Sequence, residues 1–98
     1  MKPYKEIEIS KHIFERTFDS KNKDLFDWHR DEENRKIIVL ESNENWYFQL
    51  DNELLKELYQ GIIITIPKNV FHRVIAGTGT LKIRLIKDFE GELWKFYF

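Results

Sequence analysis

The chain of 98 residues has no cysteine, and it contains only two prolines and four glycines. Without cysteine there is no disulfide, no thiolate ligand for zinc and no cysteine nucleophile. Any metal ion must therefore be held by histidine and carboxylate side chains, and stability must come from the packing of one small core. A reducing compartment fits this composition, and we expect a cytoplasmic protein.

The sequence also lacks an excess of charge of either sign. Sixteen Lys and Arg face seventeen Asp and Glu, which gives a formal net charge of -1. No global field attracts nucleic acid or an anionic membrane, so we expect no nucleic-acid partner. There is no apolar run near the ~20 residues that span a bilayer, and residues 1–10 do not resemble a secretory signal. We expect no membrane association.

What the chain does contain is enough apolar surface to fold, with 42% hydrophobic and 15% aromatic residues. We expect one domain over residues 1–98, because the chain is too short for two cores. Short segments with period-two alternation dominate, and this pattern is typical of half-buried strands. The expected strand segments are residues 4–18, 25–31, 36–41, 46–50, 62–66, 70–75 and 81–86. Six to eight short strands separated by turns predict an all-β barrel or sandwich.

Three local features follow from the residue types between these strands. Polar residues 42–45 predict a turn, so that 36–41 and 46–50 would form a hairpin. Residues 53–59 predict a loop with some helical character, and residues 76–80 a glycine-containing turn. Pro67 should end the strand before it, because proline has no N–H for a sheet.

Two histidines and one aspartate occupy informative positions. His29 and Asp31 form an H-x-D pair, and if residues 26–31 are a strand their side chains lie on one face about 7 Å apart. His72 lies five residues after Pro67. The alternative is that these residues form no functional site: the histidines are ordinary polar residues near the rim of the fold, and Asp31 belongs to a solvated turn.

The segment from Gly61 to His72 resembles the second sequence motif of the cupin superfamily. In that motif a glycine is followed by five residues, a proline, one residue, a glycine, two residues and a histidine. Gly61, Pro67 and His72 keep the spacing, and Asn69 replaces the second glycine. Asparagine tolerates a left-handed backbone better than other non-glycine residues, so this replacement is compatible with the turn. The family's asparagine four residues after the histidine is replaced by Ala76.

The first cupin motif is matched more loosely, and its spacing survives better than its residue types. His29 holds its place, Asp31 stands for the second histidine and Arg35 for the glutamate. Lys23 and Ser42 stand for the two glycines. The resemblance covers about residues 28–86, and the segment from Trp28 to Asp31 is also similar to one in small phage-encoded cupin-like proteins.

The resemblance implies a cupin-like double-stranded β-helix, or jelly-roll, barrel in which His29, Asp31 and His72 converge. Two imidazoles and one carboxylate are the ligand set of non-haem Fe(II) enzymes, and the same set can hold zinc. A divalent metal is therefore expected, with iron or zinc as first choices and manganese or nickel as alternatives. Metal-dependent oxidation or isomerisation of a small molecule is then the expected chemistry.

Arg35 does not fit a set of metal ligands, because a guanidinium cannot ligate a cation. It could clamp a carboxylate or phosphate of a small-molecule ligand beside the metal. It could equally form an ion pair with Glu32, Glu33 or Asp31. If Arg35 holds an anion in place of the missing ligand, the protein is a non-enzymatic module for a small molecule or nucleotide.

A third possibility is a degenerate barrel used for protein association. Small cupins commonly pair, so we expect a homodimer. The N-terminal strand region 4–18 and the aromatic tail 92–98 should pack on the barrel or on a partner subunit. Trp28, Trp46 and Phe48 could stack on a planar ligand, but aromatic residues on alternating strands are more often core.

Overall fold

The computed structural model describes residues 4–21 and 27–89, and almost all of its regular structure is β-strand. This confirms the all-β prediction. The described residues form eight strands: β1 (Tyr4–Ser10), β2 (Ile13–Asp19), β3 (Asn34–Glu44), β4 (Tyr47–Leu50), β5 (Lys56–Glu57), β6 (Ile63–Ile66), β7 (His72–Ile75) and β8 (Thr78–Asp88).

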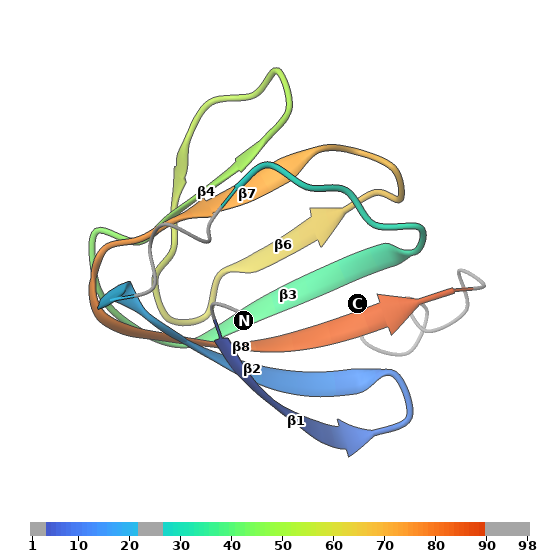
Figure 1. The fold of residues 1–98 in the computed structure, drawn as a ribbon, viewed down its shortest axis with the longest axis horizontal. Coiled ribbons are helices and arrows are strands. Elements are labelled where there is room, and N and C mark those ends of the chain that lie inside the picture. Colours follow the sequence, from blue (N-terminus) through green and yellow to red (C-terminus); the bar gives the residue numbers. More distant parts are fainter. Residues whose placement is uncertain (1–3, 22–26, 90–98) are drawn as a thin grey trace.

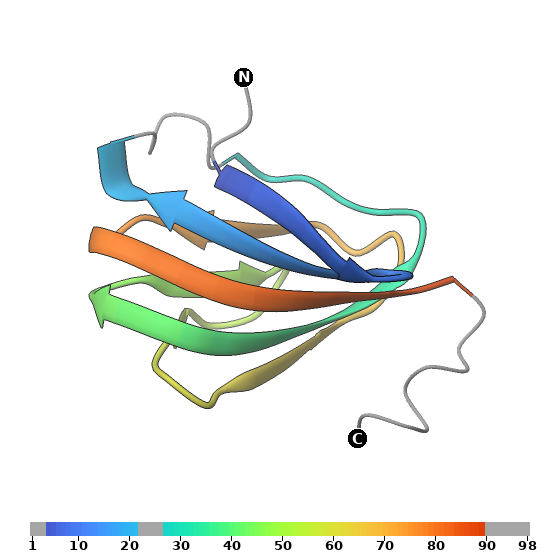
Figure 2. The same ribbon diagram turned by 90° about the horizontal axis from the view of Figure 1, so that it is seen from below.

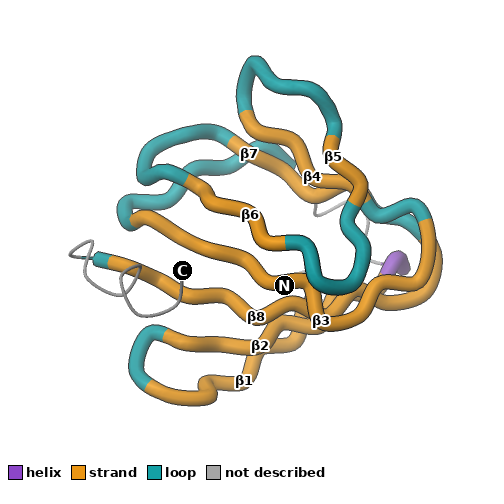
Figure 3. The backbone as a smooth tube through the Cα atoms, turned by 180° about the vertical axis from the view of Figure 1, so that it is seen from behind, coloured by secondary structure: helices purple, strands orange, loops and turns teal. Residues whose placement is uncertain are grey.

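The strands form two antiparallel sheets that face each other (Figures 1 and 2). The larger sheet has the order β1-β2-β8-β3-β6, and the smaller has the order β5-β4-β7. Within residues 4–21 and 27–89, hydrogen bonding does not close the two sheets into one continuous barrel. Figure 3 shows the strands of the two sheets as separate layers. The architecture is therefore an open, two-layered version of the expected jelly roll.

The core lies between the sheets, because alternation directs every second side chain inward. On β8 the inward residues Leu81, Ile83 and Leu85 are no more than 2% exposed. Ile37 and Val39 on β3 lie opposite Leu85 and Ile83 in the register and share their face. The smaller sheet and its connections complete the core with Trp46, Phe48 and Leu58.

The predicted hairpin of residues 36–41 with 46–50 is wrong. Strand β3 pairs with β6 and β8, whereas β4 pairs with β5 and β7, so the two segments belong to different layers. Asn45 adopts a left-handed backbone with φ 61° where the chain leaves the larger sheet. Trp46 follows it, is fully buried, and donates its Nε1–H to the Thr78 carbonyl at 2.9 Å. This anchor fixes the passage between layers.

The turns predicted at residues 42–45 and 76–80 are shorter than expected. Strand β3 continues to Glu44 and β8 begins at Thr78, because these two residues pair with each other. Asn43 contributes a side-chain bond, since its Oδ1 accepts the Thr80 N–H at 2.8 Å. Polar residues that usually terminate strands here extend a ladder.

Residues 53–59 contain no helix. They hold the two-residue strand β5, and their leucines do not share one face: Leu58 is 3% exposed, whereas Leu54 is 91% exposed. Pro67 ends β6 as predicted.

The aromatic tail 92–98 lies outside the described residues. Within residues 4–21 and 27–89 no helix is long and apolar enough to cross a bilayer. Ile7 and Ile9 on the edge strand β1 are exposed. Pairing of two copies, the single-domain boundaries and a cytoplasmic location stay predictions.

Candidate metal centre

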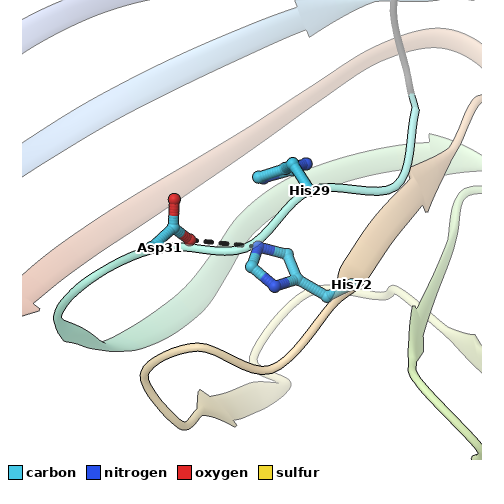
Figure 4. A group of neighbouring side chains, drawn as sticks. All are labelled: His29, Asp31 and His72. Carbon is cyan, nitrogen blue, oxygen red and sulfur yellow. Dashed lines mark ion pairs between the residues drawn. The ribbon is translucent and has the colours of Figure 1, made fainter.

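His29, Asp31 and His72 come together at one end of the smaller sheet, as Figure 4 shows. The described part of the expected strand at 26–31 is irregular rather than a strand. It touches β7 through one isolated bridge, in which the His29 N–H donates to the His72 carbonyl at 2.9 Å and the reverse bond is 2.8 Å. A single bridge is enough to align the two histidine backbones.

A second tie joins the two motif segments at Asn69. Its N–H donates to the Asp31 carbonyl at 2.7 Å, and its φ is 63°. The expected left-handed turn is therefore present without the family's glycine. Beside it, the Lys68 N–H donates to Asn34 Oδ1 at 2.9 Å. These bonds hold the Asp31 backbone against the turn that leads to His72.

Both imidazoles are oriented by a backbone carbonyl two residues earlier. Nδ1 of His29 lies 3.1 Å from the Asp27 oxygen, and Nδ1 of His72 lies 2.9 Å from the Val70 oxygen. A carbonyl only accepts hydrogen bonds, so Nδ1 carries the proton in each ring and Nε2 of a neutral ring has a lone pair. This arrangement is the one by which metal-binding histidines are usually held.

Asp31 presents one oxygen to Arg35 and the other to the histidines. Oδ1 lies 3.2 Å from Arg35 Nη2, and Oδ2 lies 3.2 Å from His72 Nε2 (Figure 4). The second contact has the distance of an ion pair but not the geometry of a hydrogen bond: Oδ2 is buried and has no hydrogen-bond partner. A buried carboxylate oxygen without such a partner is unfavourable unless a cation or proton satisfies it.

The donor set fits a divalent metal ion. One ligand atom from each residue can be chosen so that all three lie within 4.8 Å of one another. Metal–ligand bonds of roughly 2.0–2.2 Å need donor atoms closer than this, so one side chain must rotate. His29 is exposed and His72 is 3% exposed, so the adjustment falls to His29.

Arg35 forms two of the three ion pairs that the sequence suggested, one with Asp31 and one with Glu33. Its Nε donates to Glu33 Oε1 at 2.8 Å, and its Nη2 lies 2.7 Å from the same oxygen. Glu33 therefore balances the guanidinium, which in turn holds Asp31. Glu32 is exposed and takes no part. Direct contact of Arg35 with a ligand stays a prediction.

The electrostatics favour a negative carboxylate beside a neutral imidazole. Burial would raise the pKa of Asp31, but the neighbouring His72 and Arg35 outweigh it and hold that pKa below its ordinary value of 3.8. Burial lowers the pKa of His29 below its ordinary value of 6.5, and His72 adds to this, against the Asp27 carbonyl. At neutral pH the pair is in the ionisation state that binds metal.

A cavity of about 330 Å³ opens beside the three residues, between the two sheets. Its wall combines the metal-binding candidates with Arg35 and with apolar side chains from both layers: Ile37, Phe48, Ile66, Val74, Ile83 and Leu85. Tyr4 and Arg16 also line it, which the sequence interpretation missed. The only signal was the place of Arg16 among alternating residues that point inward.

The aromatic residues considered as stacking platforms divide into two groups. Trp46 and Phe48 are buried in the core, as expected for aromatic residues on alternating strands. Trp28 is 42% exposed, and the Arg73 guanidinium lies 4.7 Å from its ring centroid.

The overall arrangement matches solved structures, although no protein-family model and no curated protein sequence matches the chain. An RmlC-like cupin family protein with a double-stranded β-helix fold from Methanocaldococcus jannaschii aligns with a TM-score of 0.69 and 13% identity, covering 97% of this chain and 86% of that one. The chain has the cupin fold.

Two further cupin-fold matches differ in how much of the matched chain the alignment covers. A cupin domain from Bordetella pertussis aligns with a TM-score of 0.60 and 14% identity, covering 90% of this chain and 97% of that one. The structure described as FeII HppE aligns with a TM-score of 0.67 and 18% identity, covering 87% of this chain but 48% of that one. At these identities the likeness establishes the fold, while function must be argued from the site.

Proposed function

We propose that this cupin-fold protein binds a divalent metal ion through His29, Asp31 and His72 and receives a small anionic molecule in the adjoining cavity. The observation that carries the proposal is Asp31 Oδ2, a buried carboxylate oxygen without a hydrogen-bond partner at 3.2 Å from His72 Nε2. A cation between these atoms would satisfy both, and the imidazoles are oriented to present Nε2.

Iron or zinc is the first expectation for the metal, with manganese or nickel as alternatives, because two imidazoles and one carboxylate suit all of them. The bound ion would supply Lewis acidity or, as iron, reactivity toward dioxygen. That chemistry would serve oxidation or isomerisation of the small molecule. The fold neighbour described as FeII HppE supports iron only by analogy.

The protein's own residues would position the reactants. Arg35 holds the Asp31 carboxylate through Oδ1 and leaves Oδ2 for the metal. Phe48 supports the His72 ring, with centroids 5.8 Å apart and the planes 29° from parallel. The apolar side chains around the cavity would exclude water from the ligand.

Metal content decides the proposal. The purified chain should be loaded separately with iron, manganese, nickel and zinc, desalted, and analysed for metal by mass spectrometry. We expect about one equivalent of at least one metal, lost in Asp31→Asn and His72→Ala. Less than about a tenth of an equivalent with every metal contradicts the proposal. His12→Asn is the matched control, because His12 lies outside the site and its left-handed backbone tolerates asparagine.

A second candidate function is anion binding without metal, and the position of Arg35 in the cavity wall favours it. In that case stabilisation by an anionic small molecule persists in excess chelator. It is abolished in Arg35→Ala and retained in His72→Ala. If binding of the anion requires the metal, the stabilisation should instead be lost in excess chelator and in His72→Ala.

A further inference from the structure

Arg16 is a second guanidinium in the cavity wall, on the sheet opposite His72. In the register of β2, Arg16 lies between Glu6 on β1 and Ile83 on β8, so it shares the inward face of the larger sheet. It is 8% exposed. A charged side chain at such a position is costly to bury unless its donors are used.

Only part of that guanidinium is used within the described structure. Its Nε donates to Glu6 Oε1, and the Tyr4 ring lies under it with the centroid 4.1 Å from Cζ. Within the described part of the chain, its two terminal nitrogens donate no hydrogen bond. Arg35 differs, because Asp31 and Glu33 both contact it.

The two guanidinium groups of the cavity wall differ in how they are paired. Glu33 and Asp31 both contact Arg35, whereas Arg16 donates to Glu6 through Nε. The other carboxylate in the wall is Asp27, on the side of His29 and Asp31. The Arg16 guanidinium is therefore the group in this wall that an anionic end of a ligand would contact.

The remaining wall is apolar and the volume is small. About 330 Å³ corresponds to roughly ten water-sized groups at ~30 Å³ each. Ile83 and Leu85 lie on the same inward face as Arg16, and Phe48 lies on the opposite layer. A ligand here needs an apolar body of modest size and one anionic end.

We propose that Arg16 recognises the carboxylate of a small apolar monocarboxylic acid, whose body fills the space between Ile83, Leu85 and Phe48. The inference rests on the proposed function for its ligand class and names the residue that selects it. The two terminal nitrogens of a guanidinium match the two oxygens of a carboxylate, and Glu6 on Nε leaves that edge open.

The test compares benzoate with benzamide, which has the same shape without the charge, by titration calorimetry at constant ionic strength. Measurements on chelator-treated protein come first, because there no metal can select the carboxylate. We expect wild type to prefer benzoate, and Arg16→Gln to weaken benzoate by about tenfold or more while leaving benzamide unchanged. Equal binding of benzoate by wild type and Arg16→Gln overturns the inference.

A second variant keeps the inference testable if Arg16→Gln does not fold. Glu6→Gln removes the competing carboxylate and should tighten benzoate binding several-fold. A purely structural ion pair predicts lower stability with unchanged or weaker benzoate binding, and that result counts against the inference. Tighter binding of inorganic phosphate than of benzoate overturns the choice of a monocarboxylate.

Metal content measured on the same samples separates the two proposals. Arg16→Gln should retain the metal occupancy of wild type, because Arg16 contacts none of the three metal-binding candidates. An Arg16-dependent preference for benzoate in a protein that never takes up metal refutes the metal site and supports this inference. Full metal uptake without that preference supports the metal site and refutes this inference.

Discussion

Asp31 and His72 face each other across 3.2 Å, between Oδ2 and Nε2, without the geometry of a hydrogen bond. The two residues come from different motif segments, which are tied together by the Asn69 N–H and by the His29–His72 bridge. The backbone therefore holds the carboxylate and the imidazole close together, although the two side chains form no hydrogen bond with each other. This relationship generates the first predictions.

Asp31→Asn should lower metal affinity by about 100-fold or more while preserving the shape of the site, because a neutral amide is a weaker ligand than a carboxylate. The measurement is competition with a chelating dye for zinc or nickel. Asp51→Asn is the matched control, since Asp51 is exposed and lies outside the site. Equal affinity in wild type and Asp31→Asn contradicts a role for this carboxylate.

Glu33→Gln should weaken metal binding by about tenfold without removing a metal-binding candidate. Glu33 takes Nε and Nη2 of Arg35, so its loss leaves the guanidinium with Asp31 as its remaining carboxylate partner. Arg35 then competes more strongly with the metal for that carboxylate. Glu32→Gln, a neighbouring change at an exposed site, should have no effect. Equal losses in both variants mean that general charge, not the Arg35 contact, is responsible.

Acid should destabilise the chelator-treated protein in two ranges. The folded-state pKa of His29 is below its ordinary value of 6.5, so the unfolded chain binds more protons and stability falls as pH drops below about 6.5. The pKa of Asp31 is also below its ordinary value of 3.8, so a further loss of stability follows as the pH falls below 3.8. Urea unfolding at a series of pH values checks this. His29→Gln should show a smaller loss between pH 7 and 5, and an unchanged loss contradicts the assignment.

Local sequence patterns were enough to predict many of the strands and the residues of the candidate site. Alternation predicted most strands, Pro67 marked the end of β6, and motif spacing indicated His29, Asp31 and His72, which lie close together in the structure. The pairing of β3 with β8 was not predictable, because alternation defines the faces of a strand but not its partner. Arg16 was missed for a related reason: its place in the cavity depends on β2 pairing with β8.

Gly77→Ala should destabilise the fold strongly, by more than about 3 kcal/mol. A Cβ at Gly77 would lie 2.0 Å from the Glu44 carbonyl oxygen, where the chain returns from the smaller sheet to the larger. Backbone cannot move aside there without disturbing the ladder of β3 with β8. Gly61→Ala is the control: nothing lies within 4 Å of its Cβ position, and its φ of +91° alone should cost about 1–2 kcal/mol. Thermal unfolding of both variants measures the difference, and equal losses contradict the close approach.

Asn69→Gly should be tolerated, whereas Asn69→Val should weaken both stability and metal binding. The backbone at Asn69 has φ 63°, which glycine adopts freely and a β-branched residue does not, at a cost of about 1–3 kcal/mol. Valine would also shift the N–H that donates to the Asp31 carbonyl at 2.7 Å, and with it the carboxylate. The measurements are urea unfolding and metal competition on both variants. If Asn69→Val loses stability but keeps full metal affinity, the turn supports the fold without positioning Asp31.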